Sequence, residues 1–305
     1  MPNLAPPATT ARNRATRNQR TVRAPVHPAQ ALDTARRWLR RIIILMALSI
    51  PVLAGSWVWH ASVTAERVEQ IASNGIPRWP SPWTFVRGAL QGAPTVALQI
   101  GHLHASEHPE ELAVLRFSTG GRAGGMNEVD VNTSVALELA QRLRAAGVNV
   151  ELVGASVPPR YSATVFLSLH ADGTDDASRT GYKSAHVEPL RNRRDPWLLT
   201  TIDAAYLTAS PLAHDEANIS SDMLQYYAFS HERFDHTTDA RTTGIIVEMG
   251  YLTNPADRAW LSDPSQPADA LFEGIMRYLA AVDRWHPALL RFAGPGELDA
   301  SVLQR

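Results

Sequence analysis

The sequence predicts an α/β protein in which a mainly parallel sheet is flanked by helices on both faces, preceded by a single transmembrane helix and a disordered basic N-terminus. Three observations support this prediction. Beyond about residue 93, short apolar runs alternate with segments of helical period, which is the order expected for a parallel sheet covered by helices. Residues 42–59 are apolar and uncharged, and residues 1–41 are rich in arginine.

The basic N-terminal segment, residues 1–41, holds nine arginines and a single acid, Asp33, which gives it a net charge of +8. The rest of the chain carries 20 basic and 29 acidic side chains, a net charge of −9. A segment so charged, so rich in proline and so poor in apolar residues cannot bury enough apolar surface to fold. We therefore expect a disordered cytoplasmic tail that sets the topology, and no nucleic-acid partner.

The apolar run 42–59 contains 18 residues without a charge, which is at the short end of what spans a bilayer. Arginines precede it, and Trp57 and Trp59 stand at its far end, as expected at the two membrane interfaces. The positive-inside rule leaves the basic tail in the cytoplasm and places the larger part of the chain outside. We expect a single-pass protein of the cell membrane. The alternative is secretion after cleavage near Ala54, where small residues resemble a signal-peptide cleavage site.

A juxtamembrane stretch, residues 60–92, follows the membrane segment. Residues 62–73 predict a short helix, and three prolines within residues 77–82 predict a stiff spacer that stops any helix. The pattern then changes, which places a domain at 93–290 and leaves 291–305 as a C-terminal tail.

Within the 93–290 domain, short apolar runs predict strands and segments of helical period predict helices. The strands are expected at 96–100, 148–153, 164–170 and 244–248, and the helices at 129–146, 198–209 and 271–285.

Polar side chains stand at the carboxyl ends of three predicted strands: His102, His170 and Glu248. Functional groups of parallel sheets gather at these ends, so we expect the three side chains to lie at one edge of the sheet. The run before Glu248 is strongly apolar, and a carboxylate leaving it should be partly desolvated. Desolvation raises the pKa of a carboxyl group towards values useful to a general base.

Glu128 opens the helix that follows a glycine-rich segment, residues 120–125. An acidic residue at a helix N-terminus has a structural explanation, because it is favoured there by about 0.3–1 kcal/mol. The glycines instead suggest a flexible loop that folds back over a site. His104 and His108 lie near His102 in the sequence and compete with it as candidate ligands.

Two histidines and a carboxylate can hold a zinc ion with one coordination position open, and a second carboxylate can activate the water placed there. The chain has no cysteine, which excludes disulfides, thiolate ligands and cysteine nucleophiles. The constellation suggests a hydrolase.

The same segments resemble the zinc-dependent N-acetylmuramoyl-L-alanine amidases, the type 3 amidase family, which cleave bacterial peptidoglycan. The resemblance runs in order from about residue 96 to 285. Its motifs are Gly101-His102, Asn127-Glu128, Ser168-Leu169-His170-Ala171-Asp172 and Val247-Glu248-Met249-Gly250-Tyr251-Leu252-Thr253-Asn254.

The resemblance implies that His102, Glu128 and His170 bind Zn²⁺ and that Glu248 serves as general base and acid. Arg160 is the counterpart of a family arginine that precedes the Ser-x-His strand, which implies a substrate-binding role. The implied reaction is hydrolysis of the amide between the lactyl group of muramic acid and L-alanine of the stem peptide, with peptidoglycan as the partner and cell wall remodelling as the process.

The chain departs from the family pattern beside the site. Leu103 and His104 stand where the family has two glycines, Gln99 stands where it has aspartate, and Asp172 replaces its usual asparagine. These departures keep two alternatives open, a non-catalytic membrane-tethered module that binds peptidoglycan and a zinc peptidase of related fold. Residues 174–242 could include a regulatory element, but the sequence identifies no regulatory protein partner.

Overall fold

The computed structural model describes residues 38, 43, 64–286 and 298–299. The chain divides into two compact units, Met1–Val58 and Trp59–Arg305, and the sheet belongs to the second. Among the described residues, no helix is both long and apolar enough to cross a membrane. The predicted basic tail and membrane segment fall almost wholly outside the described residues.

The sheet is six-stranded and mainly parallel, with the strand order β6-β7-β5-β1-β4-β8. Strands β1, β4, β5, β7 and β8 run parallel to one another, whereas the edge strand β6 pairs antiparallel with β7. The strands are β1 (Thr95–Ile100), β4 (Asn149–Val153), β5 (Val165–Asp172), β6 (Lys183–Ala185), β7 (Thr243–Tyr251) and β8 (Leu298–Asp299). The prediction of a mainly parallel α/β sheet is therefore confirmed, and each of the four predicted strands forms.

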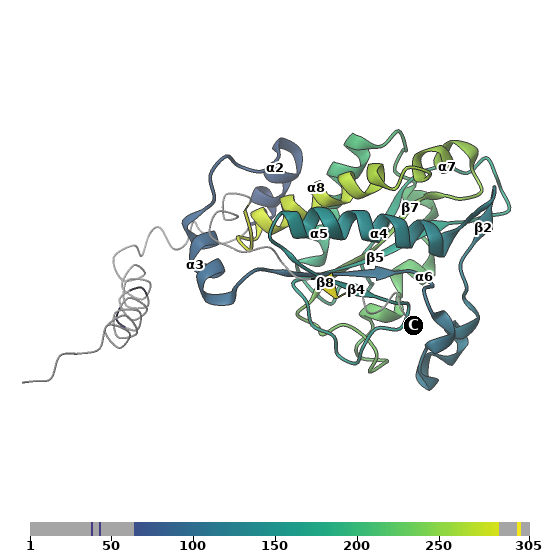
Figure 1. The fold of residues 1–305 in the computed structure, drawn as a ribbon, viewed down its shortest axis with the longest axis horizontal. Helices are drawn as coiled ribbons and strands as arrows, with labels where there is room; N and C mark the ends of the chain where they lie inside the picture. Colours follow the sequence, from purple (N-terminus) through teal and green to yellow (C-terminus); the bar gives the residue numbers. More distant parts are fainter. Residues whose placement is uncertain (1–37, 39–42, 44–63, 287–297, 300–305) are drawn as a thin grey trace, which may run out of the picture. The chain divides into compact units, whose positions relative to one another are not determined.

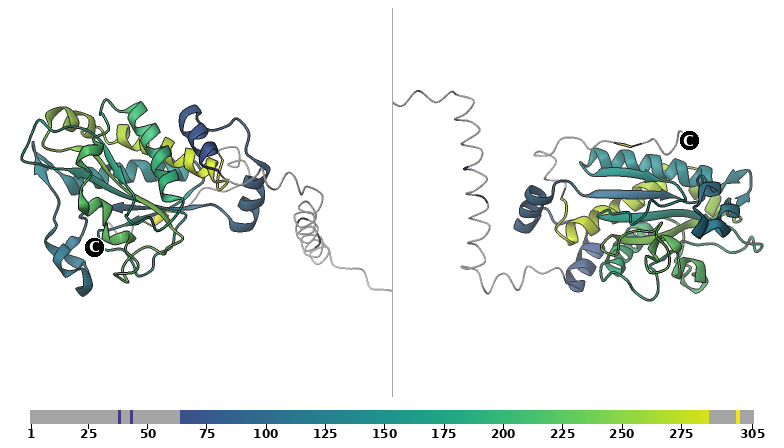
Figure 2. Two further views of the ribbon diagram at one scale, coloured as in Figure 1. Left: turned by 180° about the vertical axis from the view of Figure 1, so that it is seen from behind. Right: turned by 90° about the horizontal axis from the view of Figure 1, so that it is seen from below.

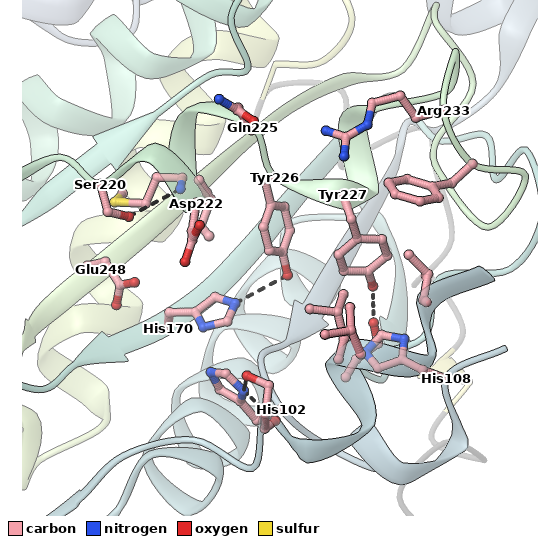
Figure 3. A pocket seen from close by; sticks show the side chains of 18 of the residues that line it. His102, His108, His170, Ser220, Asp222, Gln225, Tyr226, Tyr227, Arg233 and Glu248 are labelled. Carbon is pink, nitrogen blue, oxygen red and sulfur yellow. Dashed lines mark hydrogen bonds between the residues drawn. The ribbon is translucent and has the colours of Figure 1, made fainter. Parts of the chain in front are cut away.

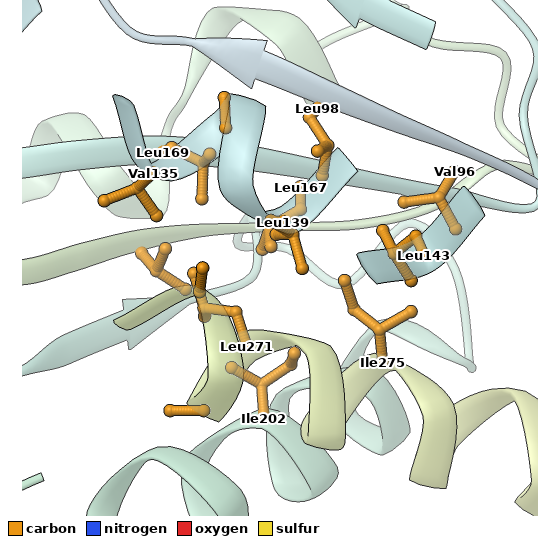
Figure 4. Close-up of a cluster of buried hydrophobic side chains, with 14 of the residues drawn as sticks. Val96, Leu98, Val135, Leu139, Leu143, Leu167, Leu169, Ile202, Leu271 and Ile275 are labelled. Carbon is orange, nitrogen blue, oxygen red and sulfur yellow. The ribbon is translucent and has the colours of Figure 1, made fainter. Parts of the chain in front are cut away.

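Alternate residues of the strands enter two different cores, because successive side chains of a strand point to opposite faces. One face of the sheet packs against α4 (Glu128–Ala145), α5 (Asp195–Ala209) and α8 (Ser265–Ala281). Figure 4 shows this core, in which Val96, Leu98 and Leu167 of the sheet meet Leu139 and other helix residues. These three helices correspond to the three predicted ones.

The other face is covered by shorter segments, among them η3 (Glu110–Phe117), α6 (Ser221–Leu224) and η5 (Tyr227–Phe229). Ala97, Phe166 and Ile246 of the sheet belong to this second core. Helices therefore flank both faces as predicted, but the long ones lie on one face. The remaining short elements are η2 (Ala105–Glu107), β2 (Arg122–Ala123), β3 (Met126–Asn127), η4 (Glu216–Asn218) and α7 (Pro255–Leu261).

Part of the segment 60–92 docks onto the domain. Helix α2 (Ala65–Asn74), close to the predicted 62–73, packs on α5 and α8. Arg67 donates hydrogen bonds of 2.9 and 2.6 Å to the buried carboxylate of Asp283, just beyond α8. Figures 1 and 2 show α2 and α3 at the end of the domain where the strands begin.

The expectation that the prolines of 77–82 stop any helix was wrong for Pro82, which begins α3 (Pro82–Gln91). Proline is favoured in the first turn of a helix, where its missing N–H has no intrahelical partner. The side chain of Ser81 caps this turn by accepting a hydrogen bond from the N–H of Trp83.

Candidate metal centre

His102 is presented by a tight turn directly after β1. Its backbone is left-handed, with φ of 63°. Gly101, just before it, lies against β5: a Cβ atom at this position would be 2.5 Å from Cε1 of His170 and 2.6 Å from the carbonyl oxygen of Leu169. Only glycine fits there without displacing β5. The Nδ1 atom of His102 lies 2.8 Å from the carbonyl oxygen of Ser118, which orients the ring so that Nε2 faces Glu128.

Glu128 is buried at the first turn of α4, with the side chain only 7% exposed. The glycine-rich loop does fold back over it, because Oε2 accepts a hydrogen bond of 2.8 Å from the N–H of Gly121. Oε1 lies 3.1 Å from Nε2 of His102 and 3.0 Å from Nδ1 of His170. Burial alone would raise the pKa of Glu128, but the hydrogen bonds and charges of the two histidines hold it well below its usual range. Glu128 is therefore ionised.

His170 lies near the end of β5 with its side chain 9% exposed. Its ring and that of His102 meet edge to face with centroids 4.8 Å apart. Its Nδ1 faces Glu128, and its Nε2 lies 3.3 Å from the hydroxyl of Tyr226. Tyr226 comes from the loop between α6 and η5 and was not predicted as a site residue.

The candidate ligand atoms of His102, Glu128 and His170 all lie within 4.8 Å of one another. Ligands of a tetrahedral site with bonds of about 2.0–2.2 Å are roughly 3.4 Å apart, close to the 3.0 and 3.1 Å found between Glu128 and the two histidines. Two imidazoles and a carboxylate are also a donor set that catalytic zinc sites use. Burial disfavours the charged form of His102, but the hydrogen bond and charge of Glu128 outweigh burial and raise its pKa. The three residues therefore form a group that could hold a metal ion.

Glu248 lies beside His170, because the two residues are paired in register on the neighbouring parallel strands β7 and β5. Figure 3 shows both side chains and His102 facing the same space. Oε2 of Glu248 is buried and has no hydrogen-bond partner in the described structure. Burial, reinforced by the negative charges of Glu128 and Asp172 and opposed by Lys183, raises the pKa of Glu248 well above that of an ordinary glutamate. A carboxyl group of this kind can accept and release a proton near neutral pH.

Lys183 explains the aspartate at position 172. It lies opposite Glu248 in the antiparallel pairing of β6 with β7. Although it is 3% exposed, its ammonium group forms an ion pair with Asp172 and donates a hydrogen bond of 3.2 Å to the carbonyl of Asn218. An aspartate can neutralise this buried ammonium group and an asparagine cannot.

Two cavities of about 600 and 590 Å³ meet at the metal-binding group, and His102, His170, Asp172 and Glu248 line both. The first cavity extends between η3 and the α6–η5 region and has walls of mixed polar and apolar character. The second runs along the glycine-rich loop and is more polar. A substrate centred on the group therefore has room on both sides of the bond at which it reacts.

The other candidates from the sequence lie elsewhere. Arg160 lines neither cavity; its guanidinium group is mostly exposed and pairs with Asp235 at 3.0 Å. His104 precedes η2 without a side-chain capping hydrogen bond and is not part of the metal-binding group. His108 is buried and lines the first cavity against Tyr227, away from the ligand atoms.

A family model described as N-acetylmuramoyl-L-alanine amidase matches residues 96–277. Among curated proteins, none is significantly similar to the chain.

Several solved structures are similar. The N-acetylmuramoyl-L-alanine amidase AmiC2 of Nostoc punctiforme is 19% identical, with a TM-score of 0.43 over 61% of this chain and 97% of its own. The amidase Ami1 of Mycobacterium smegmatis is 17% identical, with a TM-score of 0.45 over 62% of this chain and 97% of its own. The catalytic domain of CwlV from Bacillus (Paenibacillus) polymyxa var. colistinus is 19% identical, with a TM-score of 0.42 over 62% and 99%.

Proposed function

This chain belongs to the N-acetylmuramoyl-L-alanine amidase family, and from that premise we propose that His102, Glu128 and His170 hold a zinc ion while Glu248 transfers the protons of the reaction. The reaction is hydrolysis of the peptidoglycan amide that joins the lactyl group of muramic acid to L-alanine of the stem peptide. The observation that carries the proposal is the convergence of two histidines and an ionised carboxylate on one point, with an unpartnered buried carboxyl group beside them.

Zinc bound by these three residues would supply a Lewis acid that polarises a carbonyl group and acidifies water. The chain provides the orientation. The carbonyl oxygen of Ser118 fixes the ring of His102 through Nδ1, and the N–H of Gly121 binds Oε2 of Glu128. Nε2 of His102 and Oε1 of Glu128 are thereby directed to the same point. Partners of this kind fix the direction of each ligand and raise metal affinity.

Glu248 is placed to move the proton. As a carboxylate, it takes a proton from the attacking water through its unpartnered Oε2. The protonated carboxyl group then gives that proton to the amine nitrogen of L-alanine as the amide C–N bond breaks. The products are a muramic acid with a free carboxyl group and a stem peptide with a free amino terminus. The raised pKa of Glu248 suits both transfers.

The variant Glu248→Gln tests this assignment, because an amide has the shape of the carboxylate but cannot accept the proton. We expect turnover to fall by about 10²–10⁴-fold, the usual contribution of a general acid–base group, with the zinc content unchanged. The full chain would be assayed on purified cell walls, and zinc would be measured by elemental analysis. His102→Ala and His170→Ala, which remove ligands, should instead lose zinc. Release of free L-alanine amino termini by Glu248→Gln at the wild-type rate would disprove the role of Glu248.

The chain is also proposed to work outside the cytoplasm, held at the cell membrane by residues 42–59. The support is the uncharged run itself, the arginines before it and the tryptophans after it. Fractionation of cells that express the chain tests this proposal. Membrane-bound protein that external protease removes is expected, whereas a soluble product beginning near Gly55 would show cleavage instead.

A further inference from the structure

A chain of hydrogen bonds behind His170 begins at Gln99, a fully buried polar residue in strand β1, whose other buried residues are apolar. Its side-chain nitrogen lies 3.0 Å from the carbonyl oxygen of Ala155 and 2.8 Å from the hydroxyl of Tyr227. A backbone carbonyl oxygen can only accept a hydrogen bond, so the amide group of Gln99 must turn its NH₂ towards Ala155. Its oxygen, Oε1, then faces the other way.

Oε1 of Gln99 lies 3.0 Å from the hydroxyl of Tyr226. Because Oε1 can only accept, Tyr226 must donate its single proton to it. The phenol oxygen then has only acceptor capacity left for its other two neighbours. These are Oγ of Ser168 at 3.1 Å and Nε2 of His170 at 3.3 Å.

Nε2 of His170 must therefore carry the proton that it donates to Tyr226. In its neutral, metal-binding form the imidazole has one protonated nitrogen, so the proton on Nε2 leaves the lone pair of Nδ1 for the metal ion. Nδ1 is the atom that lies 3.0 Å from Glu128, within the metal-binding group. The bonds from Ala155 through Gln99 and Tyr226 thus select the tautomer of His170 that can bind a metal ion.

We propose that Tyr226, held by Gln99, is a positioning residue that prepares His170 as a metal ligand. This inference rests on the proposed zinc site, and it assigns a role to two residues for which the family motifs give none. It also explains a departure from the family pattern: Gln99 stands where the family has aspartate, and here its amide acts on the histidine through a tyrosine. Neither Tyr226 nor Gln99 needs to touch the substrate for this role.

The structure offers a matched control, because Tyr226 and Tyr227 both bond to Gln99 but only Tyr226 contacts His170. The experiment compares Tyr226→Phe with Tyr227→Phe in the full chain. Zinc affinity is measured by competition with a chelator, and thermal stability is measured with and without zinc. Loss of a group that orients a metal ligand costs about 10–100-fold in metal affinity. We expect at least a tenfold loss for Tyr226→Phe and a change within about twofold for Tyr227→Phe.

A second readout follows the tautomer itself. In the zinc-free protein labelled with ¹⁵N-histidine, Nε2 of His170 should carry a proton in the wild type, whereas Tyr226→Phe should populate the form protonated at Nδ1 alone, which Glu128 favours. Gln99→Met is a further variant, because it frees the phenol to donate to His170 and should also weaken zinc binding.

Wild-type zinc affinity in Tyr226→Phe would overturn the proposal, even if turnover fell, since Tyr226 would then act on the substrate. An equal loss of zinc affinity in Tyr227→Phe would also overturn it, because the loss would then come from a less rigid packing around Gln99 and not from the contact between Tyr226 and His170. If the wild type itself binds no zinc, the proposed metal site fails rather than this inference alone.

Discussion

Gly101→Ala is the sharpest test of how the fold brings the ligands together. The added Cβ would lie 2.5 Å from Cε1 and 2.7 Å from Nδ1 of His170, and 2.6 Å from the carbonyl oxygen of Leu169. An ordinary carbon–carbon contact is about 3.5 Å, so either β1 or the end of β5 must move by about 1 Å. Metal–ligand distances tolerate only about 0.2 Å. The substitution therefore disturbs His170 directly.

The expected cost has two parts. Overpacking of this kind destabilises a fold by about 1–3 kcal/mol, which lowers the Tm of a domain of this size by a few degrees. Misplacement of His170 should also weaken zinc binding by about 10–100-fold, the range seen when the orientation of a ligand is lost. Chelator competition measures the affinity, and calorimetry of the zinc-free and zinc-loaded protein separates the two effects.

Gly173→Ala is the matched control. Gly173 also lies beside the site, but a Cβ there would have no atom within 4 Å and its backbone is not left-handed. Its replacement should leave zinc affinity unchanged and alter stability by less than about 1 kcal/mol. Wild-type zinc affinity and Tm in Gly101→Ala would refute the view that close approach of β1 to β5 positions His170.

Two further predictions concern charge. In the pH profile of kcat/KM, the midpoint of the acid limb should lie at a higher pH than the pKa of an ordinary glutamate. The reason is that burial, and then the charges of Glu128 and Asp172, raise the pKa of Glu248. Activity needs the ionised carboxylate of Glu248. Lys183→Met removes a positive charge that lowers this pKa and should move the limb to higher pH, whereas Asp172→Asn removes a negative charge that raises it and should move the limb to lower pH. Limbs that do not move would contradict this assignment. Arg67→Met should destabilise the fold by about 3–5 kcal/mol, because it removes the ion-pair partner of the buried Asp283 carboxylate and leaves it a hydrogen bond from Thr84. Limited proteolysis should then cut near α2. An unchanged Tm would show that α2 is not held by this ion pair.

The apolar runs and the helical periodicity of the sequence were sufficient to predict most sheet strands and the long helices of the domain. The apolar runs before His102, His170 and Glu248 are strands because they are short and strongly apolar, and parallel strands bring their carboxyl ends together at one edge. The choice between His102 and His104 was harder. Both residues have a left-handed backbone in the structure, so only the packing of the turn against β5 and Ser118 decides which ring faces the site.

Other features depended on contacts between distant segments. Arg160 was chosen for its position before a strand, and in the structure its exposed guanidinium group pairs with Asp235 from a distant loop. Tyr226 lies in a polar stretch with no periodicity, and nothing in the sequence connects it with Gln99 or His170. Gln99 did give a signal, since a polar residue within a buried strand needs a hydrogen-bond partner.

The sequence by itself determined the order of strands and helices and the residue types at the strand ends, because these depend on spacing along the chain. Tertiary structure decided the chemistry of those residues. It set the ionisation of Glu128 and Glu248, the ion pair of Lys183 with Asp172 and the tautomer of His170. Each of these depends on burial and on hydrogen bonds between segments far apart in the sequence, and such contacts exist only after the chain has folded.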